Sequence, residues 1–463
     1  FTVHGNFSLS GAQLDLLVNT NTSASATVIV NGSTTTSGAS SIRMEPNNNT
    51  AGIAIFQTTD FATTSTSTAI IDFGVGANST GNEFRISGNF SKSGNGAFYT
   101  TGSSAATGFV FNKSGVQTFS YTGAASDYTQ YVVNSGSTLQ MLTGLAIGSA
   151  TSAPASKFTL NGILDMGTNV ISGGTATTNP TVVTISAGST MITANANGVS
   201  GSITTLGTKT YDSAANYELS GSVAMTNTNF VNATMNNLTI SNTSGVTQGG
   251  AITVNGNLTI ASGSALTTGA NAIGLKGNWI NNGGTLTTSN TVTLNGTSVQ
   301  SYTNTGTNIF NNLTLNNAAG LTLNNDLNVS SALTLTSGKV TLGANNVTAG
   351  SAAGSSSGYL ITNSAGKLSV TAAVSPAITT FPIGATASSY DPVTISPASS
   401  VPFAVNVKET TVAGDFAGTI NDFANVAHRQ WDITPTGTPG ATAITLTNGG
   451  AVYTPTTPVI GHY

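Results

Sequence analysis

The sequence predicts an all-β protein in which a right-handed parallel β-helix, or β-solenoid, is followed by a β-sandwich-like module. Three observations predict this fold class: short apolar segments return at a fixed step, turn residues bound each segment, and helical periodicity is nearly absent. A fixed step indicates stacked coils that share one core. The right hand follows from the strong bias of parallel crossover connections.

The repeats appear at two levels. The string Asn237-Leu238-Thr239-Ile240 returns at 257–260 and then as Asn278-Trp279-Ile280, each time after a step of about 20 residues. A longer unit aligns 237–263 with 312–338. Further echoes relate Gly5-Asn6-Phe7, Gly88-Asn89-Phe90 and Gly277-Asn278-Trp279, and relate Val116-Gln117-Thr118-Phe119 to Val299-Gln300-Ser301-Tyr302. The pattern therefore covers most of the chain from 1 to 350.

Each step reads as a strand followed by a turn. Strings such as Thr291-Val292-Thr293-Leu294 alternate apolar and polar residues and are bounded by Asn-Gly, Ser-Gly or Asn-Asn pairs. Such turns also suit hairpins and an antiparallel sandwich, but the fixed recurrence favours parallel stacking. About 370 residues at roughly 20–22 per coil predict roughly 17 coils. The Asn-rich corners either form ladders between coils or are solvated turns.

The composition changes after residue 350. We predict β-helix repeats over 1–350, a last coil or linker over 351–374, and a β-sandwich-like module over 375–463 that is incomplete at its C-terminus. The string 349–358 is rich in Ser, Gly and Ala and predicts a loop. Strands separated by longer loops are expected around 393–395, 403–407, 431–433 and 444–446, with Trp431 in the core.

Charge and cysteine content narrow the function classes. The 463-residue chain carries 11 basic and 15 acidic residues, 6% in all, whereas globular domains carry about 25%. Without a Lys/Arg cluster we expect no nucleic-acid partner. No apolar run approaches the roughly 18 residues of a membrane-spanning helix. The absence of Cys excludes disulfides and thiolate chemistry. The chain begins inside the pattern, and we expect it to be a segment of a longer polypeptide.

Parallel β-helices include polysaccharide lyases and hydrolases, which need clustered carboxylates. Stacking of adjacent coils could bring Asp60, Asp72 and Glu83 side by side, which makes them the candidates for such a cluster. The alternative is a set of separate, solvated surface carboxylates. The string 354–358 matches the serine-hydrolase pattern G-x-S-x-G without its strand–turn–helix context. His4, His428 and His462 do not have a metal-binding spacing. We therefore predict no catalytic, metal or cofactor site.

Two surface readings remain open. Aromatic residues cluster in the first third of the chain and form either a sugar-stacking face or the core. They are Phe7, Phe90, Phe109, Phe111, Phe119, Tyr121, Tyr128 and Tyr131. The run Thr64-Ser65-Thr66-Ser67-Thr68 is typical of flat ice-binding faces, but such runs do not recur at a coil period in the sequence.

Several strings together resemble the repeats of very large secreted surface proteins of Bacteroidetes, across most of the chain. They include Gly277-Asn278-Trp279, 291–300, 310–315, 320–323, 186–190, 195–201 and 211–217. The tail is similar to the module that commonly follows those repeats. Its strings are Phe381-Pro382-Ile383-Gly384, Tyr390-Asp391-Pro392-Val393, Arg429-Gln430-Trp431-Asp432-Ile433 and Gly461-His462-Tyr463.

This resemblance implies export by the type IX secretion system and attachment to the cell surface as an adhesin, gliding adhesin or filament; the C-terminal sorting domain of that route is absent. Asp212-Ser213-Ala214 matches the O-glycosylation sequon of that phylum, which makes Ser213 a candidate site or an ordinary turn residue. We expect a non-catalytic extracellular adhesive or structural protein that binds glycans, surfaces or sister copies through many weak contacts. The alternatives are a carbohydrate-active β-helix enzyme and a self-assembling filament subunit.

Overall fold

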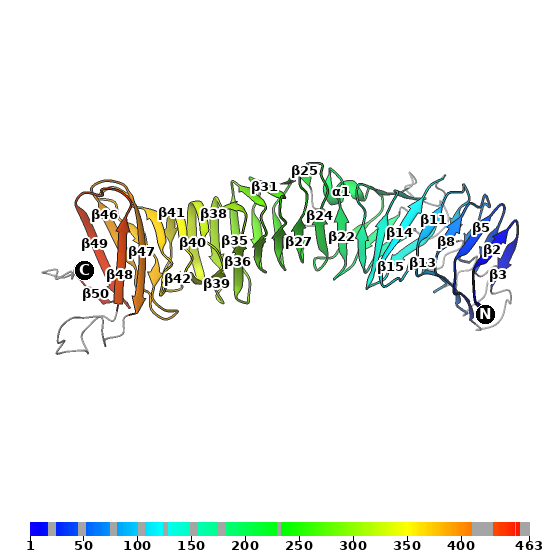
Figure 1. The fold of residues 1–463 in the computed structure, drawn as a ribbon, viewed down its shortest axis with the longest axis horizontal. Helices are drawn as coiled ribbons and strands as arrows, with labels where there is room; N and C mark the ends of the chain where they lie inside the picture. The colour runs from blue at the N-terminus through cyan, green and yellow to red at the C-terminus, as the bar shows by residue number, and fades with distance from the viewer. Residues whose placement is uncertain are drawn as a thin grey trace. The chain divides into compact units, whose positions relative to one another are not determined.

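The computed structural model describes residues 1–16, 25–44, 52–74, 81–100, 107–123, 128–148, 156–173, 181–228, 233–409, 429–449 and 451–453. The described residues form an all-β β-solenoid of about 14 turns with a small antiparallel sheet at the C-terminal end, which confirms the predicted fold class (Figure 1). The hand of the coil stays a prediction. The chain divides into unit 1 (1–238 and 242–246) and unit 2 (239–241 and 247–463), described in turn.

Unit 1 stacks three parallel sheets, which we call A, B and C. Sheet A contains β1 (Thr2–Val3), β4 (Ala26–Val30), β7 (Ala54–Thr58), β10 (Glu83–Ile86), β13 (Gly108–Phe111), β15 (Gln130–Val133), β18 (Lys157–Leu160), β21 (Val182–Ile185) and β23 (Lys209–Tyr211). Sheet B contains β2 (Phe7–Ser10), β5 (Thr34–Ser37), β8 (Phe61–Thr63), β11 (Phe90–Lys92), β14 (Gly115–Tyr121), β16 (Ser137–Met141), β19 (Ile163–Asp165), β22 (Thr190–Thr193) and β24 (Asn216–Leu219).

Sheet C is shorter and completes the turns of unit 1. It contains β3 (Gln13–Asp15), β6 (Ser41–Arg43), β9 (Ile71–Asp72) and β12 (Phe98–Tyr99), and β17 (Leu145–Ile147) pairs with β20 (Ile171–Gly173) further along. The short helix α1 (Gly198–Ser202) follows β22. Hydrogen bonds between adjacent turns show the turn length, which is 22 residues between Tyr121 and Thr143 and 29 residues between Asn89 and Thr118.

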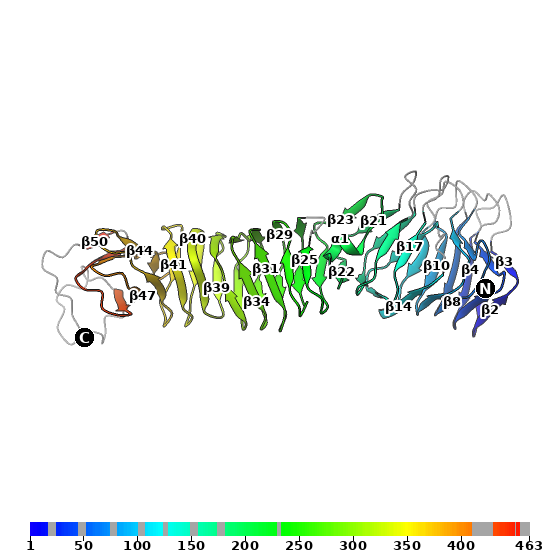
Figure 2. The same ribbon diagram turned by 90° about the horizontal axis from the view of Figure 1, so that it is seen from above.

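Unit 2 has the same architecture of stacked parallel strands (Figure 2). Sheet D contains β29 (Ile252–Val254), β32 (Ile273–Leu275), β35 (Thr291–Leu294), β38 (Asn312–Asn316), β40 (Leu327–Thr341), β41 (Val347–Ala353) and β43 (Leu368–Thr371). Sheet E contains β30 (Leu258–Ile260), β33 (Trp279–Asn281), β36 (Gln300–Asn304), β39 (Leu321–Leu323), the end of β40, β42 (Gly358–Ile361) and β45 (Ile383–Gly384), and sheet F contains β31 (Ala265–Gly269), β34 (Thr285–Thr288) and β37 (Thr307–Ile309).

Four further strands lie in the segment where the two units divide: β25 (Met225–Thr228), β26 (Thr234–Met235), β27 (Leu238–Ile240) and β28 (Val246–Gln248). In unit 2, hydrogen bonds between adjacent turns connect groups separated by 20 residues, as Asp326 and Asn346, or by 23 residues, as Asn278 and Ser301. The expected 17 turns are too many, because the short step seen in the sequence holds in unit 2 whereas most turns of unit 1 are longer.

The antiparallel strands at the C-terminal end belong to two sheets. Sheet D continues from β43 into β47 (Pro402–Glu409) and β48 (Arg429–Pro435). Sheet G contains β44 (Thr379–Phe381), β46 (Val393–Pro397), β49 (Thr442–Asn448) and β50 (Ala451–Tyr453). All four strands expected in this region are present, and Trp431 is half-buried on β48.

The boundary region around residue 350 differs from the expectation in one respect. Residues 349–353, whose composition predicts a loop, lie in β41, because Val347 and Ala349 fill interior positions of that strand and its backbone pairs with β40. Parallel pairing of β42 with β45 extends the coil pattern to residue 384. The part of 351–374 that was left open as coil or linker thus contains strands of the solenoid. The domain boundary at 375 stays a prediction.

The interior explains why the sequence forms these strands. Successive side chains of a strand point to opposite faces, and short strands such as β27, β29 and β30 alternate buried, half-buried and buried. In unit 1 the interior holds an aromatic stack. Phe90 lies 4.7 Å from Phe119 and Phe56 lies 4.8 Å from Phe84, as stacked ring centroids. The aromatic cluster of the first third is therefore mainly core, as one of the two readings expected.

The Gly-Asn-aromatic echo marks one corner of each turn that carries it. Asn6 Oδ1 accepts the Ser33 N–H at 2.9 Å, Asn89 Oδ1 accepts the Thr118 N–H at 2.9 Å, and Asn278 Oδ1 accepts the Ser301 N–H at 2.8 Å. A Cβ on Gly277 would overlap the Gly256 carbonyl group, so only Gly fits there. The ladder reading of the Asn corners is confirmed, with backbone N–H groups as the main donors.

The repeated Val-Gln string places a buried Gln side chain that hydrogen-bonds to the backbone at a corner of the coil; we call this a bracket. Gln117 is buried and accepts the Lys113 N–H at 3.0 Å. Gln300 is buried and accepts the Gly296 N–H at 3.0 Å, while its Nε2 donates to the Leu275 carbonyl oxygen in the preceding turn at 3.0 Å. In both cases the Gln side chain accepts the backbone N–H of the residue four positions earlier in the chain. The echo in the sequence is therefore a repeated hydrogen-bonding device.

Candidate binding surface

The outer face of sheet B in unit 1 carries two columns of hydroxyl groups. The alternation that turns Phe61, Phe90 and Phe119 inward turns their neighbours outward. Register pairs align one column across five strands: Ser8, Thr35, Ala62, Ser91 and Ser120. The second column lies two positions further along the chain: Ser10 and Ser37 end β2 and β5, and Thr64, Ser93 and Thr122 directly follow β8, β11 and β14. Ala62 is the one position of the two columns without a hydroxyl.

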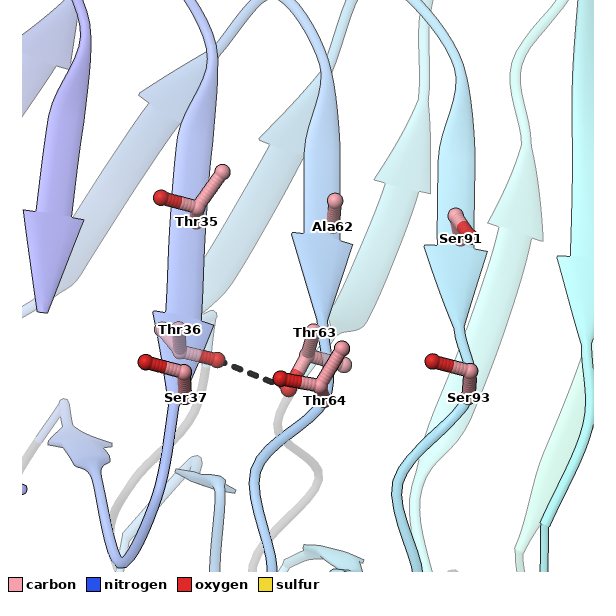
Figure 3. A pocket seen from close by; sticks show the side chains of 8 residues that line it. All are labelled: Thr35, Thr36, Ser37, Ala62, Thr63, Thr64, Ser91 and Ser93. Carbon is pink, nitrogen blue, oxygen red and sulfur yellow. Dashed lines mark hydrogen bonds between the residues drawn. The ribbon is translucent and has the colours of Figure 1, made fainter. Parts of the chain in front are cut away.

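The columns are held in register by bonds between strands. Ser8 and Thr35 hydroxyls lie 2.8 Å apart, and Ser37 Oγ donates to Ser10 Oγ at 3.2 Å. Beneath them, Thr36 Oγ1 donates to Thr63 Oγ1 at 2.7 Å, and both of these side chains are buried (Figure 3). A shallow depression of 170 Å³ runs across β5, β8 and β11, lined by Thr35, Thr36, Ser37, Ala62, Thr63, Thr64, Ser91 and Ser93. The surface is thus ordered and polar.

No charged side chain points outward from these strands within their described residues. The one cation of β11, Lys92, points inward and is fully buried. Its Nζ lies 3.2 Å from the Tyr121 hydroxyl and 4.2 Å from the centre of that ring.

Contiguous Thr runs do not predict these columns, because the aligned hydroxyl residues alternate with buried residues and return at a longer step than that of the clearest repeat. The signal is a pair of hydroxyl residues at i and i+2. The pair returns after 27 residues between β2 and β5, and after 29 residues between β11 and β14.

The three carboxylates proposed as a cluster lie on different elements and have separate partners. Asp60 precedes β8 and accepts the Asn89 N–H at 2.7 Å and the Ser33 hydroxyl at 3.1 Å. Asp72 lies on β9 in sheet C, and Glu83 on β10 in sheet A pairs with Arg85. Across the described ranges, no group of three or more His, Asp or Glu side chains is placed to hold a metal ion. The carboxylates are separate, as the alternative reading expected, but Asp72 is buried, so the prediction of a surface position is wrong for that residue.

Sheet C carries an ion pair beside Asp72. Arg43 forms a two-pronged contact with Asp15, Nε to Oδ1 at 2.8 Å and Nη2 to Oδ2 at 2.7 Å. The hydrogen bond from Arg43 holds the pKa of Asp15 below its ordinary value. Asp72 is the register partner of Arg43 on the other side. The Asp15–Arg43 pair satisfies its own charges and offers no unneutralised group for acid–base chemistry.

The remaining candidates are placed as follows. Ser213 is exposed in the turn between β23 and β24, where Asp212 Oδ1 accepts the Ala214 N–H at 2.8 Å. His4 is exposed on the first turn, and His428 and His462 lie outside the described residues. The serine-hydrolase-like string 354–358 forms a tight turn between β41 and β42, closed by paired Ser355 and Gly358 backbone bonds, with no helix after it. The required context of that motif is absent there.

No protein-family model matches the chain, and comparisons with curated proteins and with solved structures find no match. Among the described residues, no helix is long and apolar enough to cross a membrane. The fold and the hydroxyl surface are therefore the observations from which a function is argued.

Proposed function

We propose that the chain is a non-catalytic, extracellular adhesive β-solenoid displayed on a cell surface. The observation that carries this proposal is the uncharged hydroxyl surface on β2, β5, β8, β11 and β14. Strands lie about 4.8 Å apart and same-face residues about 6.6 Å apart along a strand, so the array offers regularly spaced donors and acceptors. Each contact is weak, and multiplicity supplies the affinity.

The resemblance to large secreted surface proteins of Bacteroidetes supports the same proposal. It adds export by the type IX machinery, a location outside the cell, and glycans, surfaces or sister copies as partners. Ser213 remains the proposed O-glycosylation site, supported by its exposure in a turn. A carbohydrate-active enzyme finds less support, because Asp60, Asp72 and Glu83 each have a different set of neighbours.

The test is a binding assay of the purified chain against glycan arrays and whole bacterial surfaces. The variant Thr35→Asp/Ser91→Asp places two negative charges on the hydroxyl surface, and we expect at least a tenfold loss of surface-bound chain. The matched control is Thr334→Asp, which adds a charge at an exposed outward position of β40. Equal binding by all three proteins contradicts the proposed surface. Release of reducing sugar ends from any bound polysaccharide contradicts the non-catalytic assignment.

A further inference from the structure

The end of sheet D in unit 2 is closed by strands that run the other way. β43 pairs parallel with β41 on one side, with Leu368 opposite Val347, and antiparallel with β47 on the other, with Leu368 opposite Val405. An open strand edge invites pairing with another chain, and natural proteins cover such edges. β47 covers this edge, and β48 then covers β47.

A single buried carboxylate joins the segments that make this closure. The Asp391 side chain is fully buried. Its Oδ1 accepts the Gly449 N–H at 2.9 Å, and its Oδ2 accepts the Arg429 Nε–H at 3.1 Å and the Ala385 N–H at 3.2 Å. The Ser389 hydroxyl also donates to Oδ2. These donors come from the turn before β46, from the start of β48 and from the turn after β49.

Arg429 extends the network to the end of β47. Its Nη2 donates to Ser389 Oγ at 3.0 Å, and its Nη1 lies 3.4 Å from Glu409 Oε1. Glu409 and Arg429 are also the last register pair of β47 and β48. The network therefore ties sheet G to the two strands that close sheet D. A folded protein loses much stability when a buried carboxylate loses its partners. It also loses stability when the carboxylate is removed, because the buried donors are then left unpaired.

The last turns of the solenoid also hold β47 directly, through its antiparallel pairing with β43 and through side-chain bonds from the residues that directly follow β42. Thr362 Oγ1 donates to the Val407 carbonyl oxygen at 3.0 Å and accepts the Val407 N–H at 2.8 Å. Asn363 Oδ1 accepts the Glu409 N–H at 2.8 Å. These side-chain bonds lie at one end of β47, whereas Asp391 fixes the strands of sheet G and the start of β48. Loss of Asp391 therefore loosens the closure without removing the strands of the coil.

We propose that β44 and β46–β49 are a cap held by the Asp391 network, and that release of this cap turns β43 into a docking edge for a second copy of the chain. The occupant is β47 of that second copy, because β47 is the strand whose alternation already matches β43. Exchange of an identical element between protomers is a low-cost route to a dimer. The capped chain is the monomer, and the uncapped chain is a strand-swapped dimer.

The first experiment measures molecular mass by light scattering after size exclusion. We expect the native chain to stay at its monomer mass of 46.1 kDa and Asp391→Ala to elute at about twice that mass. Asp391→Asn, which keeps the shape and loses the charge, is expected to give a mixture of both species. The control Asp432→Asn removes a half-exposed carboxylate of β48 that pairs with Lys367 at 2.7 Å, and it should remain monomeric. A monomeric Asp391→Ala protein overturns the proposal.

The second experiment identifies the strand that docks. Ser369 and Ala404 are opposite each other on β43 and β47, and opposite residues of antiparallel strands lie close enough for a disulfide. The chain has no other Cys. After oxidation, Ser369→Cys/Ala404→Cys should form a bond within one chain in the native background and between two chains in the Asp391→Ala background. A bond within one chain in the dimer overturns strand exchange.

Hydrogen exchange separates this result from general misfolding. In Asp391→Ala, amides of sheet G (β44, β46 and β49) should lose protection, while β47 keeps its protection through pairing with β43 of the second copy, and β38, β40 and β41 keep theirs because each turn of a solenoid depends mainly on its neighbours. If amides throughout unit 2 lose protection, Asp391 stabilises the whole unit. That result overturns the proposal that its network holds only the cap.

Discussion

Units 1 and 2 use the same architecture with different interiors. The turns of unit 1 up to residue 131 are filled by stacked aromatic rings, and the turns of unit 2 are filled mainly by Leu, Ile and Val. Within the described part of unit 2, the buried Phe residues are Phe310, Phe381 and Phe403. Unit 2 adds buried amides such as Gln300, Asn281 and Asn317 as brackets. The comparison teaches that one solenoid architecture accepts both aromatic and aliphatic interiors.

The largest expected effect tests the aromatic interior of unit 1. Phe90 contacts five other rings at centroid distances of 4.7–6.0 Å. Phe90→Ala should destabilise unit 1 by about 3–5 kcal/mol, because a cavity replaces the ring. Denaturant unfolding measures the loss, and hydrogen exchange should place it in unit 1. The neighbouring control Ser91→Ala is expected to change stability by less than about 0.5 kcal/mol. Equal losses for both variants contradict a packed aromatic core.

The second prediction compares the two Gln brackets. Gln300→Met should cost about 2–4 kcal/mol, because it leaves the Gly296 N–H and the Gly277 carbonyl group without their partner and removes one of the two donors to the Leu275 carbonyl group. Gln117→Met should cost less, since Gln117 makes one short bond and one at 3.4 Å. Unfolding curves of the two variants give the ranking. The reverse order contradicts the view that unit 2 depends more on amide brackets.

The third prediction concerns alkaline pH and includes both units. Burial raises the pKa of Tyr211 in unit 1 and of Tyr302 in unit 2 to about 12. A raised folded-state pKa means that the stability is complete below the ordinary value near 10 and is lost as pH rises toward 12. Unfolding followed at pH 9, 10.5 and 11.5, together with phenolate absorbance, checks this. Tyr302→Phe should flatten the decline in unit 2 while leaving that of unit 1, and an unchanged decline contradicts the assignment.

The smallest effect tests the surface ion pair of unit 1. Asp15 has a lowered pKa because of Arg43, so its contribution is present above the ordinary value near 3.8 and is lost as pH falls below it. Both side chains are partly exposed, so Asp15→Asn should cost at most about 1 kcal/mol at neutral pH. The cost should shrink in 1 M salt. A cost that is independent of salt contradicts an electrostatic role.

Much of the fold is predictable from the sequence, because a period constrains stacked strands strongly. The short repeat step, the Gly-Asn-aromatic corners and the four C-terminal strands follow from local patterns. The turn number was wrong because the clearest repeat lies in unit 2, where turns are short. The Asp391–Arg429 network was missed because its members are 38 residues apart in a segment without a repeat. No local pattern brings such residues together.

The hydroxyl surface is a second feature whose neighbouring residues the sequence alone does not show. Ser8, Thr35 and Ser91 are ordinary residues in a chain rich in Ser and Thr, and only register aligns them. The function proposed for them depends on that alignment. Residue identity therefore predicts the polarity of this surface, and the geometry of the coil predicts its order.

The Asn corners also bear on how such a chain changes over generations. Each turn that carries a corner Asn presents an acceptor to the turn that follows and a backbone N–H to the turn before, as Asn278 does between Asn257 and Ser301. A duplicated turn carries both the Asn side-chain acceptor and the backbone N–H donor. Insertion or deletion of a whole turn therefore leaves neither group without a hydrogen-bond partner. The length of the protein is then free to drift by whole turns while each junction stays chemically intact.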